Sequence, residues 1–189
     1  MTKFISNIRR FAAIALAVLA FGSLTACDSD EDEAGTPAES GYYSRERFIE
    51  LKPSLFPYVY VQGDGLKESE YCIKFQTDKG YLIDKTKVDQ YTYSYISPVY
   101  NDGEMIVLPE IIVQLKSGNA DIDGIIDRFK DNSGRKILSV DADKGDGRYY
   151  LSVKASTSAE VLRIANSIHG LDGVKWCEPE MLVQINFAH

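Results

Sequence analysis

The side chains of this 189-residue chain show no spacing that is typical of covalent catalysis. The chain has two histidines, and His169 is the only one inside a segment that is predicted to fold, directly before Gly170. A cation is favourable at a helix C-terminus, so we interpret His169 as a helix-end residue rather than a general base. The chain has no Gly-x-Ser-x-Gly nucleophile elbow and no phosphate-binding glycine loop. We therefore expect no catalytic residue and no cofactor.

Two acidic strings resemble the beginning of a calcium-binding loop, at Asn119–Gly124 and at Asp141–Gly147. Their twelfth positions are Lys130 and Ser152, where such a loop requires a bidentate glutamate. A helix N-terminus accounts for the first string and a hairpin turn for the second. Calcium remains the minority alternative, and with two histidines and no Cys-x-x-Cys a zinc site is not expected.

The most specific chemical signal is Cys27, which follows Leu24-Thr25-Ala26. A basic start is followed by the apolar run 11–21, which is about half the length that a membrane-spanning helix needs. These features predict a secretory signal peptide over residues 1–26. The ending resembles a bacterial lipobox, in which Cys27 becomes the acylated first residue, so we expect a lipid anchor in the cell envelope, at the outer membrane.

Residues 27–41 are predicted to be a disordered acidic tether. Six of the acidic residues lie between positions 28 and 39, and almost no residue there can bury apolar surface. The simplest interpretation is a spacer. The acidic run also resembles an export tag that displays lipoproteins on the cell surface, so the periplasmic and surface locations both stay open. The net charge of −7 and the absence of a basic cluster argue against nucleic acid as a partner.

Cys72 and Cys177 are the remaining cysteines. An oxidising compartment permits a disulfide between them, but their separation in the sequence gives no distance between them. We favour two buried thiols and leave the pairing open.

Residues 42–108 are predicted to form a β-rich module. Short segments rich in Tyr, Val and Ile alternate with turn residues, and strands are expected at 48–51, 57–62, 70–76 and 90–100. Ten of the twelve tyrosines lie here, and the alternation of Tyr91, Tyr93 and Tyr95 predicts that all three face one side of a strand. Such a face either binds a glycan or peptide or, more commonly, packs as part of the fold.

Residues 109–189 are predicted to form a second unit of the order βαββαβ. Strands are expected at 111–115, 135–140, 149–153 and 174–185, with a helix at 122–129. A second helix is expected between the capping box Thr157–Glu160 and Gly170. The fold class predicted from this order is α+β, with a ferredoxin-like unit after the β-rich module.

The chain resembles the N-terminal prodomain of subtilisin-like serine proteases, particularly the fervidolysin-type group. The segments that carry the resemblance are Glu110–Lys116, Ala165-Asn166 and Gly173–Pro179, with a strand-rich lead-in at Tyr42-Tyr43, Leu51 and Ile96–Tyr100. The chain departs from the family at Cys177, where alanine is usual, and at Glu180, where asparagine is usual.

This resemblance implies a binding function. Prodomains of the family lay their sheet on the protease and run the following segment into the substrate cleft as an added strand. Here that segment is Gln184, Ile185, Asn186, Phe187, Ala188 and His189. The Asp, His and Ser residues of the chain do not form a recognisable catalytic triad. We therefore expect a non-catalytic module that binds or inhibits a subtilisin-like protease in trans. The alternative for the tail is that residues 183–185 merely complete the last strand.

Two further functional hypotheses remain. A surface adhesin or glycan-binding module would use the tyrosine-rich strands, and a purely structural envelope role would need no specific ligand. The oligomeric state is not indicated by the sequence.

Overall fold

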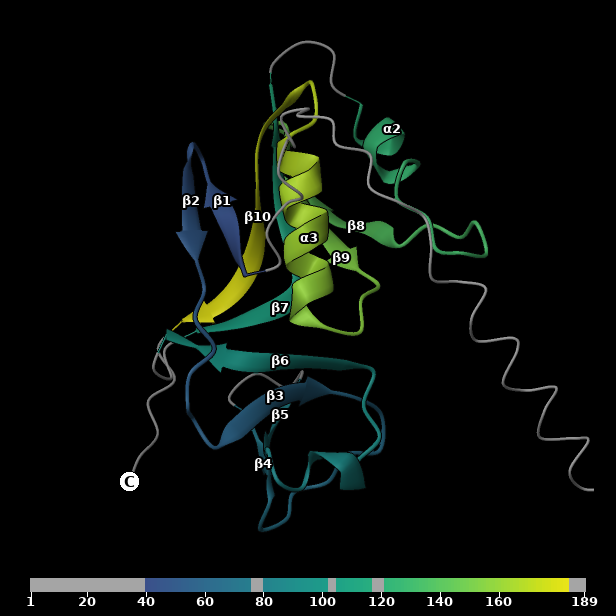
Figure 1. Cartoon of the computed structure of the whole chain (residues 1–189). Helices are drawn as coiled ribbons and strands as arrows, with labels where there is room; N and C mark the ends of the chain where they lie inside the picture. Colours follow the sequence, from purple (N-terminus) through teal and green to yellow (C-terminus); the bar gives the residue numbers. More distant parts are fainter. Residues whose placement is uncertain (1–39, 76–79, 102–104, 117–120, 184–189) are drawn as a thin grey trace, which may run out of the picture. The chain divides into compact units, whose positions relative to one another are not determined.

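The protein has a mixed, sheet-rich fold with few helices, which confirms the α+β-like class. We describe a computed structural model, in which residues 40–75, 80–101, 105–116 and 121–183 are placed. All of these residues belong to one compact unit, Gly35–His189 (Figure 1). The predicted signal peptide, Cys27 and residues 184–189 lie outside the described residues.

The described residues contain ten strands, two α-helices and a short 3₁₀ helix. The first six strands are β1 (Gly41–Ser44), β2 (Arg47–Glu50), β3 (Tyr58–Gln62), β4 (Cys72–Lys74), β5 (Tyr81–Asp84) and β6 (Tyr95–Tyr100), with η1 (Val88–Gln90) before β6. The later elements are β7 (Met105–Leu115), α2 (Ile122–Ile126), β8 (Leu138–Asp143), β9 (Arg148–Val153), α3 (Ser158–His169) and β10 (Val174–Val183).

One eight-stranded sheet runs through the unit in the order β4-β5-β3-β6-β7-β9-β8, and β10 pairs with β7. β7 is the central strand. β10 pairs antiparallel along most of it, while β6 pairs with its first residues and β9 with residues 110–114. β1 and β2 form a separate antiparallel hairpin. The boundary expected between residues 108 and 109 therefore falls inside a strand.

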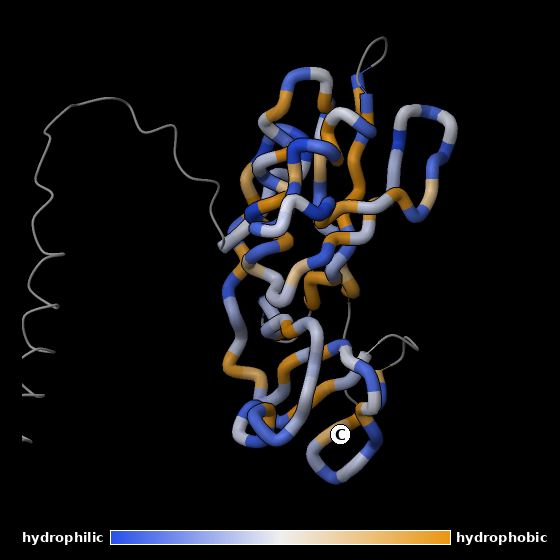
Figure 2. Tube along the Cα trace, turned by 90° about the vertical axis from the view of Figure 1, so that its right-hand side faces the viewer, coloured by the Kyte–Doolittle hydropathy of each residue, from blue (hydrophilic) through white to orange (hydrophobic). Residues whose placement is uncertain are grey.

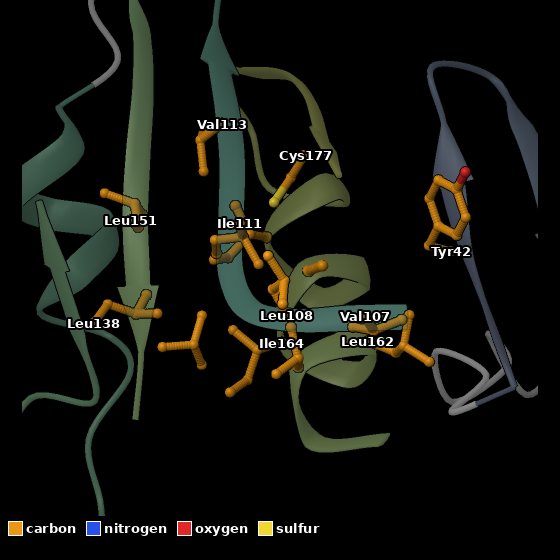
Figure 3. Close-up of a cluster of buried hydrophobic side chains, with 14 of the residues drawn as sticks. Tyr42, Val107, Leu108, Ile111, Val113, Leu138, Leu151, Leu162, Ile164 and Cys177 are labelled. Carbon is orange, nitrogen blue, oxygen red and sulfur yellow. The ribbon is translucent and has the colours of Figure 1, made fainter. Parts of the chain in front are cut away.

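β7 bends where its ladder with β10 is irregular. Ile111 pairs with Pro179 and Val107 pairs with Met181, so three residues of β7 face a single residue of β10. Pro109 lies in this interval and has no N–H to donate, which suits an interrupted ladder. Figure 3 shows the strand turning at Leu108. Because of this bend, the residues before it pair with β6 and the residues after it pair with β9.

α3 forms where the sequence predicts it. Thr157 is the N-cap, its side chain accepts a hydrogen bond from the Glu160 N–H, and the Glu160 carboxylate accepts from the Thr157 N–H, which confirms the capping box. The C-cap is Gly170. The helix buries one apolar face, including Leu162 and Ile164, against β7 (Figure 3). α2 ends at Ile126, earlier than predicted, although Phe129 still packs on the core.

Apolar side chains form two clusters. The larger cluster joins α3, α2, β7, β9 and β10 with the inner side of β6. The smaller cluster has Val59, Val61, Cys72 and Ile83 at its centre. Figure 2 shows hydrophobic and hydrophilic residues alternating along many of the extended segments. β3 departs from this alternation, because Tyr60 and Val61 are both fully buried, on opposite faces.

The sequence prediction for the tyrosine-rich region is partly wrong. The strand expected at residues 90–100 begins only at Tyr95, since η1 and a loop occupy the preceding residues. β5 was not expected, and β4 is shorter than the predicted 70–76. In the second unit, the strand predicted at 135–140 lies at Leu138–Asp143. Gly41, the last residue of the predicted tether, begins β1.

Candidate functional site

The sheet formed by β8, β9, β7 and β10 has one face that no described helix covers. Strand register places eight half-buried residues on it, which we call the open sheet face: Glu110, Ile112, Gln114, Arg148, Tyr150, Ser152, Trp176 and Glu178. Their neighbours in sequence, such as Ile111, Val113 and Leu151, are fully buried on the α3 side. The alternation thus produces one core face and one mixed polar and aromatic face.

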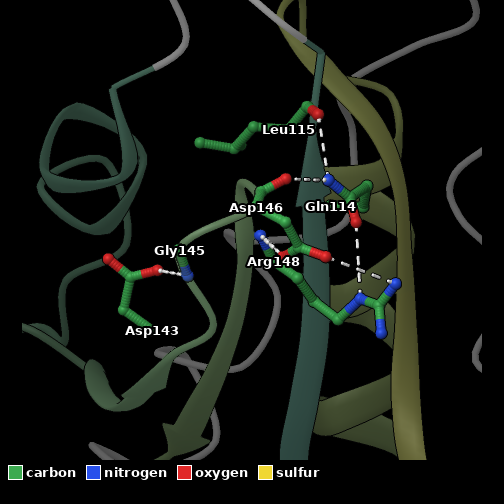
Figure 4. Close-up of polar contacts among 6 residues, drawn as sticks. All are labelled: Gln114, Leu115, Asp143, Gly145, Asp146 and Arg148. Atoms are coloured by element: carbon green, nitrogen blue, oxygen red, sulfur yellow. Dashed lines mark hydrogen bonds and ion pairs between the residues drawn. The ribbon is translucent and has the colours of Figure 1, made fainter.

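A hydrogen-bond network holds one end of the open sheet face (Figure 4). The Gln114 side-chain amide donates to the Asp146 carbonyl at 3.0 Å, and the Arg148 Nε donates to the Gln114 Oε1 at 3.4 Å. The Asp146 carboxylate accepts from the Arg148 backbone N–H at 3.1 Å and lies 3.8 Å from its guanidinium. The turn between β8 and β9 is thereby fixed against β7.

The same turn contains the second calcium-like string. Asp143 accepts a hydrogen bond from the Gly145 N–H at 2.7 Å, and Gly145 and Gly147 have φ angles of +76° and +80°. These are the features of a tight turn that glycine stabilises. In the first string, Asp121 is the N-cap of α2. Within the described residues, no three His, Cys, Asp or Glu side chains are grouped to hold a metal ion.

The β1–β2 hairpin is attached to α3 by the carboxamide of Asn166, which is 4% exposed. Its Nδ2 donates to the Gly41 carbonyl at 2.8 Å, and its Oδ1 accepts from the Tyr43 N–H at 3.2 Å. A strand directs the C=O of residue i and the N–H of residue i+2 to the same edge, so this side chain takes the place of a neighbouring strand beside β1.

His169 and Glu178 complete the attachment of the hairpin. The His169 ring stacks on Tyr43, with centroids 5.1 Å apart, and its Nδ1 accepts from the Cys177 N–H at 3.2 Å. The Ser44 hydroxyl donates to the Glu178 carboxylate at 3.1 Å. Burial, and secondly the charge of Glu178, raise the pKa of Tyr42. His169 is thus the last residue of α3, and its ring packs against the hairpin.

The three tyrosines of the predicted aromatic face are separated. Tyr95 is 2% exposed, and its hydroxyl donates to the Val107 carbonyl at 2.8 Å in the larger cluster. Tyr91 and Tyr93 precede β6 and pack on the smaller cluster. The prediction that all three face one side of a strand is wrong, because the chain enters the strand only at Tyr95.

Cys72 and Cys177 are both buried free thiols, and they lie in different clusters. Burial raises the pKa of each thiol, and a nearby carboxylate adds to the effect, Glu68 at Cys72 and Glu178 at Cys177. Both side chains act as small apolar residues in the core.

Sequence reasoning did not find the roles of Asn166, Tyr150 or Trp176. A buried asparagine late in an apolar helix face is a signal of a specific hydrogen-bond partner, but the sequence does not name that partner. Trp176 and Tyr150 come together on one face only through the pairing of β10, β7 and β9.

The strands and helices define a mixed, sheet-rich α+β-like protein. No family model, no curated protein and no solved structure matches this chain. Among the described residues, neither α-helix has the length and apolar character needed to cross a bilayer.

Proposed function

We propose that this chain is a lipid-anchored, non-catalytic protein of the bacterial cell envelope whose second unit binds a subtilisin-like protease in trans. The observation that carries the proposal is the strand order β10-β7-β9-β8. With all neighbours antiparallel and a helix before β8 and before β10, this arrangement supports the ferredoxin-like unit expected from the prodomain resemblance.

The protease contact is the open sheet face. Its aromatic residues, Tyr150 and Trp176, flank the aliphatic Ile112 on β7, and Glu110 and Arg148 provide charge around them. Tyrosine, tryptophan and arginine are the residues most enriched among energetically dominant interface positions. The Gln114–Asp146–Arg148 network supports binding because it holds this face in one arrangement before a partner arrives.

The segment Gln184–His189 provides the second contact. It follows β10, whose last residue, Val183, is 63% exposed. The segment binds the substrate cleft as an added strand, so its backbone supplies the affinity and its alternate side chains fill the subsites.

An inhibition assay with a subtilisin-like protease tests this function. The chain Gly35–His189 retains every described strand and helix. We expect it to inhibit, and a form that ends at Gln184 to have an inhibition constant at least tenfold higher. Trp176→Ala should weaken inhibition, whereas its exposed neighbour Lys175→Ala should not. Equal inhibition by the full and shortened chains would remove the tail contact, and no inhibition by any form would contradict the function.

The membrane anchor is the acylated Cys27, with residues 28–39 as its acidic tether. A prodomain normally acts once, on the enzyme to which it is joined, whereas an anchored copy acts repeatedly and in trans. Incorporation of labelled palmitate by the wild-type chain and its loss in Cys27→Ala test the anchor independently of protease binding. Incorporation that survives Cys27→Ala would contradict the assignment.

A glycan-binding function has one observation in its favour. A hollow of about 460 Å³ with mixed polar and apolar walls lies beside Tyr91 and is also bordered by Asp64, Leu66, Glu68 and Gln90. The Tyr91 and Ser69 hydroxyls are hydrogen-bonded at 2.9 Å. An aromatic ring beside two carboxylates and one amide is suitable for a sugar. Glycan-array binding that Tyr91→Ala abolishes would favour this function over the first.

A further inference from the structure

An apolar groove of about 540 Å³ lies beside the first turn of α3. Its floor contains Val59 of β3 and three alternate residues of β6, Ile96, Pro98 and Tyr100. Leu51 and Ser40 also line the groove. No charged side chain is among its described lining residues. The volume lies within the range of about 300–1,000 Å³ that is typical of ligand sites.

Ser40 connects this groove to the preceding chain. It is the first described residue, and its carbonyl accepts a hydrogen bond from the Leu51 N–H at 2.7 Å, which fixes it at the groove. One residue spans at most about 3.6 Å, so the residues directly before Ser40 remain within reach of the groove. The concentration of this segment near the groove is therefore on the order of millimolar, whatever the protein concentration.

The distribution of charge in the segment before Ser40 indicates that its uncharged residues are the ones able to bind in the groove. Residues 28–33 are mostly acidic, whereas Gly35, Thr36, Pro37 and Ala38 carry no charge, and Glu39 follows them. Burying an unpaired carboxylate in an apolar groove is strongly unfavourable. Proline fixes its own φ and biases the residue before it towards an extended conformation, so ordering this segment in an extended form costs less conformational entropy.

We propose that Thr36, Pro37 and Ala38 bind in this groove as an intramolecular ligand, with Pro37 over Pro98. The tether then leaves the folded unit at the groove, and only the acidic residues before Gly35 act as the spacer. This site depends on neither acylation of Cys27 nor protease binding.

Nuclear magnetic resonance of the chain Gly35–His189 tests the site, because this compact unit contains both the segment and the groove. We expect backbone order parameters of about 0.85 at Thr36 and Ala38, the value for rigid backbone. We also expect nuclear Overhauser contacts between the Pro37 and Pro98 rings. Order parameters below about 0.6 without such contacts would overturn the proposal.

Variants separate docking from a general change in the fold. Pro37→Asp lies outside the described core and should lower the order parameters at Thr36 and Ala38 to below about 0.6. Leu55→Asp, a fully exposed position away from the groove lining, should leave them unchanged. In a mixture of labelled and unlabelled chains, contacts that pass between molecules would assign the groove to a second copy and overturn the intramolecular site.

Discussion

The helix-bearing region, residues 105–183, and the tyrosine-rich region, residues 41–100, bury apolar surface in different ways. In the helix-bearing region, α3 covers one face of the strands, and buried and half-buried residues alternate over residues 110–115 of β7 and 150–153 of β9. In the tyrosine-rich region, β3 and β5 bury consecutive residues, because both of their faces pack. The one-sided arrangement leaves the open sheet face without a described helix over it, whereas the two-sided arrangement buries both faces of β3 and β5.

Truncation of one core residue in each region has the largest expected effect. Leu162→Ala on α3 and Ile83→Ala on β5 each remove a fully or almost fully buried side chain, and each should lower the free energy of unfolding by about 2–5 kcal/mol. Because both regions share one sheet, urea unfolding should follow a single transition in each variant. Two separate transitions would show that the regions are independent domains. Val140→Ala, on an exposed side chain, is the control, with a change below about 0.5 kcal/mol.

Asn166→Ala tests the connection between the hairpin of the tyrosine-rich region and α3. It removes both side-chain hydrogen bonds to β1 and leaves the Gly41 carbonyl and the Tyr43 N–H without this partner. We expect a loss of about 2–4 kcal/mol in chemical denaturation and faster amide exchange across β1. The neighbouring Ser167→Ala removes only a hydroxyl bond to the Arg163 carbonyl and should cost less than about 0.5 kcal/mol. Equal effects would contradict the role of Asn166.

Tyr95→Phe and Tyr91→Phe compare how much a buried and an exposed tyrosine hydroxyl contribute to stability. The buried Tyr95 hydroxyl donates to the Val107 carbonyl, whereas the Tyr91 hydroxyl forms an exposed contact with Ser69. We expect Tyr95→Phe to cost about 1–2 kcal/mol and Tyr91→Phe less than about 0.5 kcal/mol, measured by thermal and urea unfolding. A larger effect at Tyr91 would show that the loop tyrosines have a structural role that the contacts do not indicate.

Alkaline pH gives a smaller and more specific test of the same contrast. Burial raises the pKa of Tyr95 well above its ordinary value near 10, so the unfolded chain loses this proton at a lower pH than the folded chain. The contribution of the protonated Tyr95 hydroxyl to the free energy of unfolding is therefore complete below about pH 10 and decreases as the pH rises further. Stability should fall less steeply above about pH 10 in Tyr95→Phe than in the wild type. An unchanged slope would contradict the burial of this hydroxyl.

The sequence predicts the helix-bearing region better for a physical reason. α3 has a one-sided apolar face and a capping box, and both signals are local. Tyr95 illustrates the opposite case. The alternation of Tyr91, Tyr93 and Tyr95 predicts one strand face, but β6 begins only at Tyr95, whose side chain is buried in the core. β5 was missed because its two central residues, Leu82 and Ile83, are both buried and show no alternation.

The candidate site was less predictable than the fold. The open sheet face brings Tyr150 and Trp176 onto the same side of one sheet through pairing across β9, β7 and β10, which no local pattern records. Asn166 belongs to a segment that carries the prodomain resemblance, but its contact with β1 depends on where the hairpin packs. Cys27 and the tail at 184–189 rest on the sequence alone, because they lie outside the described residues.

Isothermal titration of the chain Gly35–His189 with a subtilisin-like protease whose catalytic serine has been blocked tests the central proposal most directly. Blocking the serine separates binding from digestion of the chain. We expect a complex of one chain with one protease, a dissociation constant below about 1 μM, or about −8 kcal/mol, and clear weakening by Trp176→Ala. Absence of binding at concentrations of tens of micromolar, while the chain remains folded, would contradict the account.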